Sequence, residues 1–119
     1  MEITLQKIFV LALLFIGEAL TIYAEIAGAK NQELATQPVL QIFFKMFLIF
    51  CLAGVFLISG YAFGFKVFKN IWVVSAASIT SILIIEPIVA WTIFHQLPTT
   101  GAVVGFVLGA IGLFSTILF

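Results

Sequence analysis

The chain has 119 residues, of which 64% are hydrophobic and 8% are charged, and its five lysines balance its five glutamates. Soluble domains carry about 25% charged residues, so this composition excludes an ordinary water-soluble protein. It also excludes a nucleic-acid-binding domain, which needs a clustered basic surface. The single cysteine, Cys51, lies in an apolar run, which excludes a disulfide framework and a thiolate metal cluster.

Four segments of the chain are long and apolar enough to be predicted as membrane spans, because about 20 mostly apolar residues cross a bilayer. They cover approximately residues 8–27, 46–65, 71–94 and 101–119. Lipid offers no hydrogen bonds to the backbone, so each segment should be a helix. The sequence therefore predicts an all-α integral membrane protein: a four-transmembrane-helix bundle that forms one domain over residues 1–119.

The first segment contains two acidic residues, Glu18 and Glu25. Glu18 lies about 10–15 Å from either end of the segment, where a charge costs roughly 2.5–3.5 kcal/mol on insertion scales. Seven residues separate the two glutamates, and Thr21 lies between them on the same helix face. A carboxylate attracts a cation when deprotonated and releases it when protonated, so we expect this stripe to bind a proton or a substrate.

Both glutamates also have a purely structural interpretation. Glu18 can make an interhelical hydrogen bond that only holds the bundle together. Glu25, nearer the helix end, can reach the membrane interface or pair with Lys30 or Lys45. The residue types alone leave these alternatives open.

Polar residues from Lys30 to Gln41 form the only substantial predicted loop, and the connections at 66–70 and 95–100 are short. Short connections make sequential helices antiparallel neighbours. Three lysines lie on the side of the amino terminus and two on the opposite side. This weak bias favours a cytoplasmic amino terminus but is small enough for both orientations to be populated.

The third segment carries a second polar stripe, in which Ser75, Ser78 and Glu86 lie roughly on one face, while Thr80 and Ser81 face elsewhere. Pro87 follows Glu86, removes a helical donor and tends to kink the helix. An acid beside a kink is consistent with a hinge in an alternating-access mechanism. The structural alternative is that a hydroxyl group of a neighbouring helix simply satisfies Glu86.

Glycines mark the helix faces that can approach another helix closely. Gly105, Gly109 and Gly112 share a face of the fourth segment, and spacing does not decide whether their partner belongs to the same subunit. Gly60 and Gly64 of the second segment are expected to pack internally.

No nucleophile–base pair, phosphate-binding loop or metal constellation is present, and His95 stands alone. We therefore expect neither an enzyme nor a cofactor.

The pattern resembles the small multidrug resistance family and, more broadly, the drug/metabolite transporter superfamily. Gly17-Glu18-Ala19 looks like that family's membrane-embedded glutamate, and residues 90–96 (AWTIFHQ) resemble the end of its third helix. Gly105 and Gly112 match the glycines, seven apart, by which its fourth helices dimerise. Residues 86–90 (EPIVA) look like the Glu-Pro element of larger members of the superfamily.

The chain also departs from that family. Ser75 and Ser78 occupy the positions of its substrate-contacting tyrosine and tryptophan, Glu25 and Glu86 are additional acids, and the first loop is longer. The resemblance implies a proton-coupled efflux transporter for a small cationic or amphipathic solute, in the inner membrane of a prokaryotic cell. It implies a homodimer, with subunits that can be antiparallel, or a heterodimer with a related chain.

In that interpretation Glu18 is the site for proton and substrate, Ser75 and Ser78 line the cavity, and Gly105 and Gly112 form the dimer contact. Two alternatives remain. Four-helix proteins of the superfamily resemble subunits of flippases for lipid-linked sugars, whose polar headgroup suits a serine-lined groove. The other alternative is an accessory membrane subunit that transports nothing.

Overall fold

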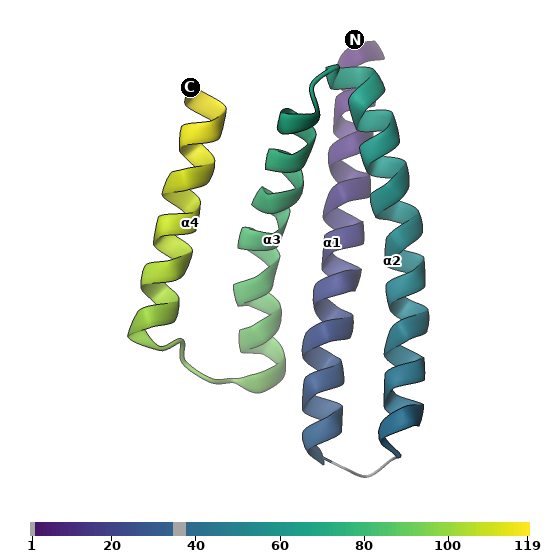
Figure 1. Ribbon diagram of the computed structural model, residues 1–119, viewed down its shortest axis with the longest axis vertical. Coiled ribbons are helices and arrows are strands. Elements are labelled where there is room, and N and C mark those ends of the chain that lie inside the picture. The colour runs from purple at the N-terminus through teal and green to yellow at the C-terminus, as the bar shows by residue number, and fades with distance from the viewer. Residues whose placement is uncertain (1, 35–37) are drawn as a thin grey trace.

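The computed structural model describes residues 2–34 and 38–119, and its elements are four α-helices, which confirms the all-α prediction. They are α1 (Glu2–Leu34), α2 (Val39–Phe68), α3 (Ile71–Phe94) and α4 (Thr100–Leu118). The helices run alternately down and up, side by side, and both termini lie at the upper end in Figure 1. At the opposite end, here called the lower end, α1 finishes, α2 begins and α3 leads into α4.

α1 and α2 extend beyond the apolar segments that predict them, α3 has the predicted bounds, and α4 is displaced from its predicted bounds by one residue. The prediction of a loop over Lys30–Gln41 is wrong for most of that run, because α1 continues to Leu34 and α2 begins at Val39. At the end of α1 the added residues include lysine and glutamine, which are good helix formers without being apolar. At the start of α2 the added residues are mostly apolar, and the candidate span there begins at Val39. Residues 35–37 lie outside the described part of the chain.

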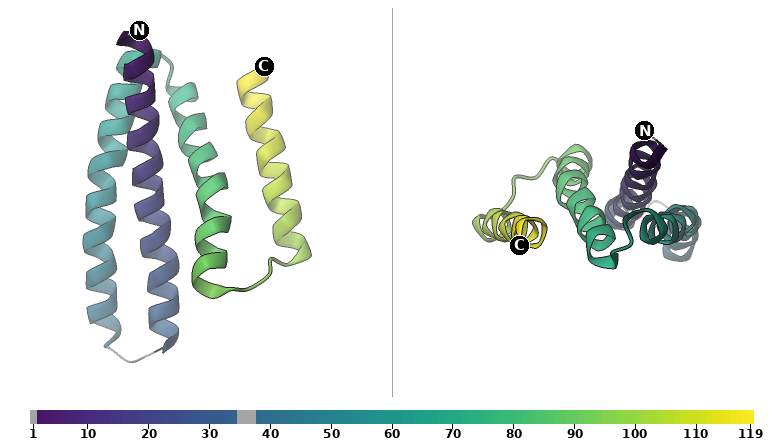
Figure 2. Two further views of the ribbon diagram at one scale, coloured as in Figure 1. Left: turned by 180° about the vertical axis from the view of Figure 1, so that it is seen from behind. Right: turned by 90° about the horizontal axis from the view of Figure 1, so that it is seen from above.

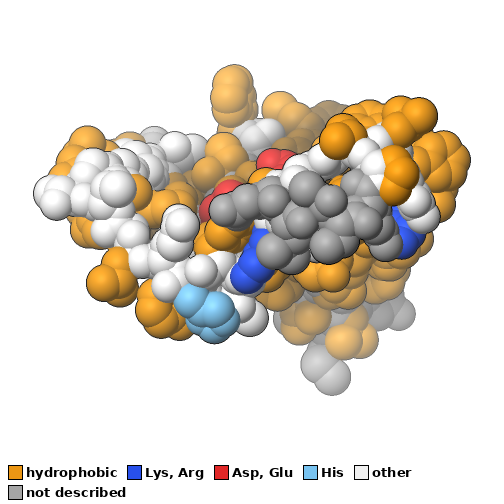
Figure 3. Space-filling view, turned by 90° about the horizontal axis from the view of Figure 1, so that it is seen from below, with side chains coloured by type: hydrophobic (Ala, Val, Ile, Leu, Met, Phe, Trp, Pro, Cys, Tyr) orange, Lys and Arg blue, Asp and Glu red, His pale blue; other side chains and the backbone are white. Residues whose placement is uncertain are grey.

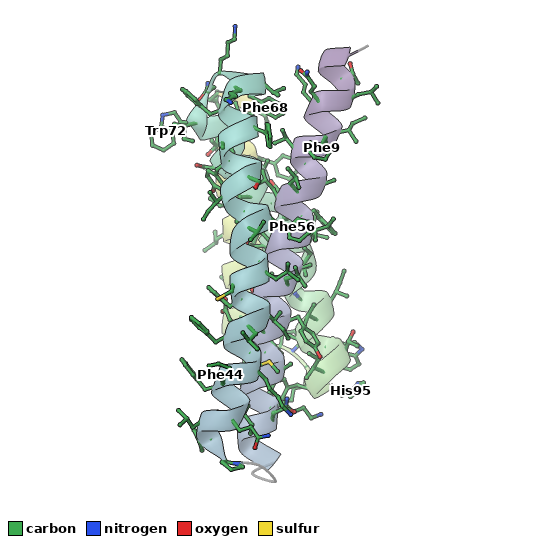
Figure 4. All side chains as sticks on the ribbon, turned by 90° about the vertical axis from the view of Figure 1, so that its right-hand side faces the viewer. Phe9, Phe44, Phe56, Phe68, Trp72 and His95 are labelled. Carbon is green, nitrogen blue, oxygen red and sulfur yellow. The ribbon has the colours of Figure 1, made fainter. Side chains whose placement is uncertain are left out.

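In the described part of the chain, three helices are long and apolar enough to cross a membrane, with candidate spans at Thr4–Gln32, Val39–Phe68 and Ile71–Phe94. The apolar stretch of α4, Thr100–Thr116, is shorter. Large apolar side chains cover the outer surface, including Phe44 near one end and Trp72 near the other, which are 60% and 74% exposed (Figure 4). Soluble monomers rarely expose such continuous apolar surface, so these features indicate an integral membrane protein.

The connections after α2 and before α4 are closed by local hydrogen bonds. Lys69 ends α2 in the left-handed conformation, and the Asn70 side chain accepts a hydrogen bond from the Trp72 N–H at 2.9 Å. Thr99 caps α4 in the same way, because its hydroxyl accepts from the Ala102 N–H at 3.1 Å. These caps satisfy helix-end donors in two turns that are too short for anything except antiparallel neighbours.

α1, α2 and α3 pack against one another, most extensively α1 against α2, whereas α4 contacts only α3 within the described part of the chain. The view from above in Figure 2 shows α4 standing apart from α1 and α2. The largest fully buried side chains, Val10, Leu14 and Val74, form one core cluster toward the upper end, where α1, α2 and α3 converge.

Two glycines of α2 allow the close approach within this core. A Cβ atom added at Gly60 would lie 2.8 Å from Leu14 Cδ2, and one added at Gly64 would lie 3.0 Å from Val74 Cγ2. Real Cβ atoms essentially never make a contact as short as the one at Gly60, and the one at Gly64 is tighter than nine in ten of their contacts. The prediction that Gly60 and Gly64 pack internally is therefore confirmed.

Candidate functional site

A buried hydrogen bond joins the polar stripes of α1 and α3. Glu18 is 8% exposed and Ser78 is 3% exposed, and the Ser78 hydroxyl donates to Glu18 Oε1 at 2.6 Å. A distance of this length is typical of a hydroxyl that donates to a carboxylate. The predicted stripes of the first and third segments therefore face each other, and Glu18 and Ser78 meet between them.

The other carboxylate oxygen of Glu18, Oε2, makes no hydrogen bond within the described part of the chain. In that same part, every fully enclosed side-chain oxygen or nitrogen has a hydrogen-bond partner. Oε2 is therefore not fully enclosed within the described part of the chain. A carboxyl with one fixed partner and one oxygen that lacks a protein hydrogen bond there is able to exchange a proton or contact a cation.

The remaining hydroxyls of the predicted site do not reach Glu18. Thr21 donates to the carbonyl of Gly17 at 2.9 Å, within its own helix. Ser75 is half-buried and makes no side-chain hydrogen bond within the described residues. Ser81, which the sequence places on another face, is buried and donates to the Ala77 carbonyl at 3.0 Å.

Two further carboxyls lie toward the lower end. Glu86 of α3 is half-buried and interacts electrostatically with Glu25 and with Glu18. Acidic side-chain atoms are visible from below, between the helix ends (Figure 3). Like charges repel one another when all three carboxyls are ionised, and the repulsion is strongest in a medium of low dielectric constant. A bound proton or cation would relieve it.

Lys30 does not pair with Glu25, contrary to one of the alternatives left open by the sequence. Its ammonium instead donates to the carbonyl oxygen of Ile93 at 2.6 Å and lies 5.8 Å from the ring centroid of Phe94. A cation is favourable at the carboxyl end of a helix, where carbonyl groups lack intrahelical donors. Nothing in the sequence predicted this contact. It connects the lower ends of α1 and α3.

The three glycines of α4 do not share one environment. A Cβ atom added at Gly109 would lie 3.5 Å from Leu83 of α3, whereas atoms added at Gly105 and Gly112 would meet nothing within 4 Å. Gly109 therefore faces α3, and the other two glycines face the open outer side of α4. That surface is available to another helix.

An apolar hollow of about 540 Å³ separates the lower parts of α3 and α4. Pro87, Trp91 and Phe94 line it from α3, and Ala102 and Phe106 line it from α4. No glutamate or lysine lines this hollow, so it suits an apolar group rather than an ion.

Comparison of the chain with protein-family models, with curated proteins and with solved structures finds no match.

Proposed function

We propose that this chain is a subunit of a proton-coupled membrane transporter of the drug/metabolite type, which moves a small cationic or amphipathic solute. The observation that carries the proposal is the Glu18 carboxyl, which is almost fully buried, has the Ser78 hydroxyl as a partner on one oxygen and makes no hydrogen bond through the other within the described residues. Ionisable groups inside membrane helices are costly and are functional by default.

In the proposed cycle, the ionised Glu18 binds either a proton or the cationic group of the solute. The Ser78 hydroxyl donates to the ionised form and holds the carboxylate in one orientation. Protonation removes the negative charge and releases the solute. Glu86 and Glu25 add negative potential along the route to the lower end.

The proposed assembly is a dimer in which all four helices cross the bilayer. The length of α4, about 28 Å for 19 residues at 1.5 Å each, is close to the thickness of the hydrocarbon core. Gly105 and Gly112 face open space, which supports a contact with a second subunit. The nearly balanced lysines are consistent with antiparallel subunits. The proposed location is the inner membrane of a prokaryotic cell.

A second candidate is a flippase subunit for a lipid-linked sugar. The apolar hollow between α3 and α4 favours it, because a lipid chain could lie there. Stabilisation of the purified chain by polyprenyl-phosphate lipids but not by amphipathic amines would select this function.

Flux measurements in proteoliposomes test the leading proposal. Amphipathic ammonium compounds should drive proton flux through the wild-type chain, and Glu18→Gln should abolish that flux. The amide oxygen can still accept the Ser78 hydrogen bond, so the variant should remain folded. Undiminished coupled flux would refute the assignment. An effect of Glu18→Gln on assembly alone would instead indicate an accessory subunit.

A further inference from the structure

A second hollow, of about 300 Å³, lies between α1 and α2 toward the lower end. Its wall on α2 is aromatic: Phe43, Phe47 and Phe50 are each about half exposed, and the rings of Phe43 and Phe47 stack with centroids 6.1 Å apart. Its wall on α1 includes Ala24 and the carboxylate-bearing side chain of Glu25. This combination of one acid and three phenylalanines is separate from the Glu18–Ser78 pair.

Among the described residues, Glu25 is the only ionisable one that lines this hollow. Within the described residues it forms no hydrogen bond or ion pair, and Lys30, the lysine nearest to it in sequence, donates to the Ile93 carbonyl instead. Glu25 is seven residues from Glu18 and seven from Gln32, the last residue of the candidate span, or about 10 Å from each. Glu25 is exposed and lies within the candidate span, where an ionised group surrounded by lipid calls for a counter-charge.

We propose that this hollow, formed by Ala24, Glu25, Phe43, Met46, Phe47 and Phe50, binds an organic ammonium ion that carries an apolar group. The Glu25 carboxylate neutralises the cation, and the phenylalanine rings contact both the cation and its apolar substituent. The proposal rests on the proposed function only in stating that the transported solute binds at this hollow on its way across the membrane. Binding of an ammonium ion there does not depend on transport.

The chemistry of the hollow decides the class of ligand. A calcium or magnesium ion takes six or more oxygen ligands, and the hollow offers a single carboxylate. The described residues contain no group of three or more histidine, cysteine or acidic side chains placed to hold a metal. A neutral apolar molecule would leave the carboxylate unpaired, and an anion would be repelled. An ammonium ion gains both the charge pair and the attraction of aromatic faces for cations.

Binding of benzyltrimethylammonium to the full chain in nanodiscs of phosphatidylglycerol tests the proposal. The measurement is made in the Glu18→Gln background, so that the Glu18 carboxylate makes no contribution. Glu25→Gln should raise the Kd about tenfold, the effect of losing one partly screened charge pair. Neopentylbenzene, which has the same shape without the charge, should bind far more weakly than the ammonium compound.

Two matched phenylalanine variants test the same binding site even if the Glu25→Gln variant does not stay folded. Phe47→Leu should raise the Kd about threefold, because it removes one aromatic face. Phe63→Leu is the control, since Phe63 lies on the same helix with a similar exposed fraction, 47% against 50%, and does not line the hollow. It should leave the Kd unchanged.

Three results would overturn the proposal: an unchanged Kd in Glu25→Gln, equal binding of the neutral isostere, or equal effects of the two phenylalanine substitutions. Displacement of the probe by added phosphatidylethanolamine would identify a lipid headgroup as the occupant and overturn the assignment to a solute. Loss of proton flux is not a readout here, so failure of this inference and failure of the proposed transport cycle are distinguishable.

Discussion

The Ser78 hydroxyl oxygen lies 2.6 Å from Glu18 Oε1, and this hydrogen bond joins α1 to α3 between residues 60 positions apart in the chain. It is buried at both ends, so the free energy of unfolding depends on it more than on a hydroxyl at the lipid-facing surface. The same bond fixes the orientation of the carboxyl that the proposed cycle uses. The Glu18–Ser78 hydrogen bond is therefore expected to contribute both to stability and to the proposed function.

Ser78→Ala should lower the free energy of unfolding by about 1–2 kcal/mol, because a buried carboxyl loses its hydrogen-bond donor. Ser115→Ala is the matched control. Ser115 is exposed and donates only to the Ile111 carbonyl of its own helix, so its loss should cost less than about 0.5 kcal/mol. Unfolding in mixed detergent micelles measures both variants. Equal effects would mean that the Glu18–Ser78 bond contributes nothing specific to stability.

Gly17→Ala should destabilise the α1–α2 contact by about 1–3 kcal/mol through overpacking. The added Cβ would lie 2.7 Å from Leu57 Cγ and 3.2 Å from the Leu57 backbone nitrogen, so a rotamer change alone does not relieve the clash. Gly54→Ala, where nothing lies within 4 Å, should be neutral or slightly stabilising. Thermal unfolding of the two variants provides the comparison. Similar melting temperatures for the two variants would contradict the close approach of the helices.

Some helix bounds could be predicted, because the length of an apolar segment and the residues that begin and end a helix can be read from the neighbouring sequence alone. The bounds of α3 follow from Asn70, whose side chain caps the first turn, and from the polar residues after Phe94. The ends of α1 and α2 could not be predicted in this way. Residues 30–33 continue α1 without being apolar, so hydropathy carries no information about them.

In the candidate site, too, some features could be predicted from the sequence and others could not. Helical spacing predicted that Glu18 and Ser78 each lie on a polar stripe, but which pair meets depends on the rotation of α1 against α3, which buried Val10, Leu14 and Val74 set. The inward position of Ser81 and the contact between Lys30 and Ile93 depend on that same packing. The periodicity of a single helix carries no information about how two helices pack against each other.

Lys30→Met should lower the free energy of unfolding by about 1 kcal/mol, because the Ile93 carbonyl loses a charged donor while the apolar stem of the side chain is retained. Lys66→Met is the control. Its ammonium lies 5.9 Å from the Phe63 ring on an exposed face, where such a contact contributes about 0.5 kcal/mol. Unfolding curves of the two variants that coincide would rule out a role for Lys30 in holding α1 to α3.

Gly112→Leu should weaken the proposed dimer without unfolding the subunit, since its side chain would enter open space on α4. Ile111→Phe, which adds bulk to a different exposed position of the same helix, should leave the dimer intact. Sedimentation equilibrium in detergent gives the association constant, and far-ultraviolet circular dichroism monitors the helices. Unchanged association of the Gly112 variant would exclude this face from the interface.

Proton release on ligand binding tests the central claim about Glu18 most directly. The ligand is an ammonium compound that raises the melting temperature of the chain, and it is added to purified protein in weakly buffered detergent solution. We predict that binding releases protons from the wild-type chain and from Ser115→Ala, and that Glu18→Gln releases none. Equal proton release from the wild type and from Glu18→Gln, or none from the wild type, would contradict the proposal that proton and cation share this carboxyl.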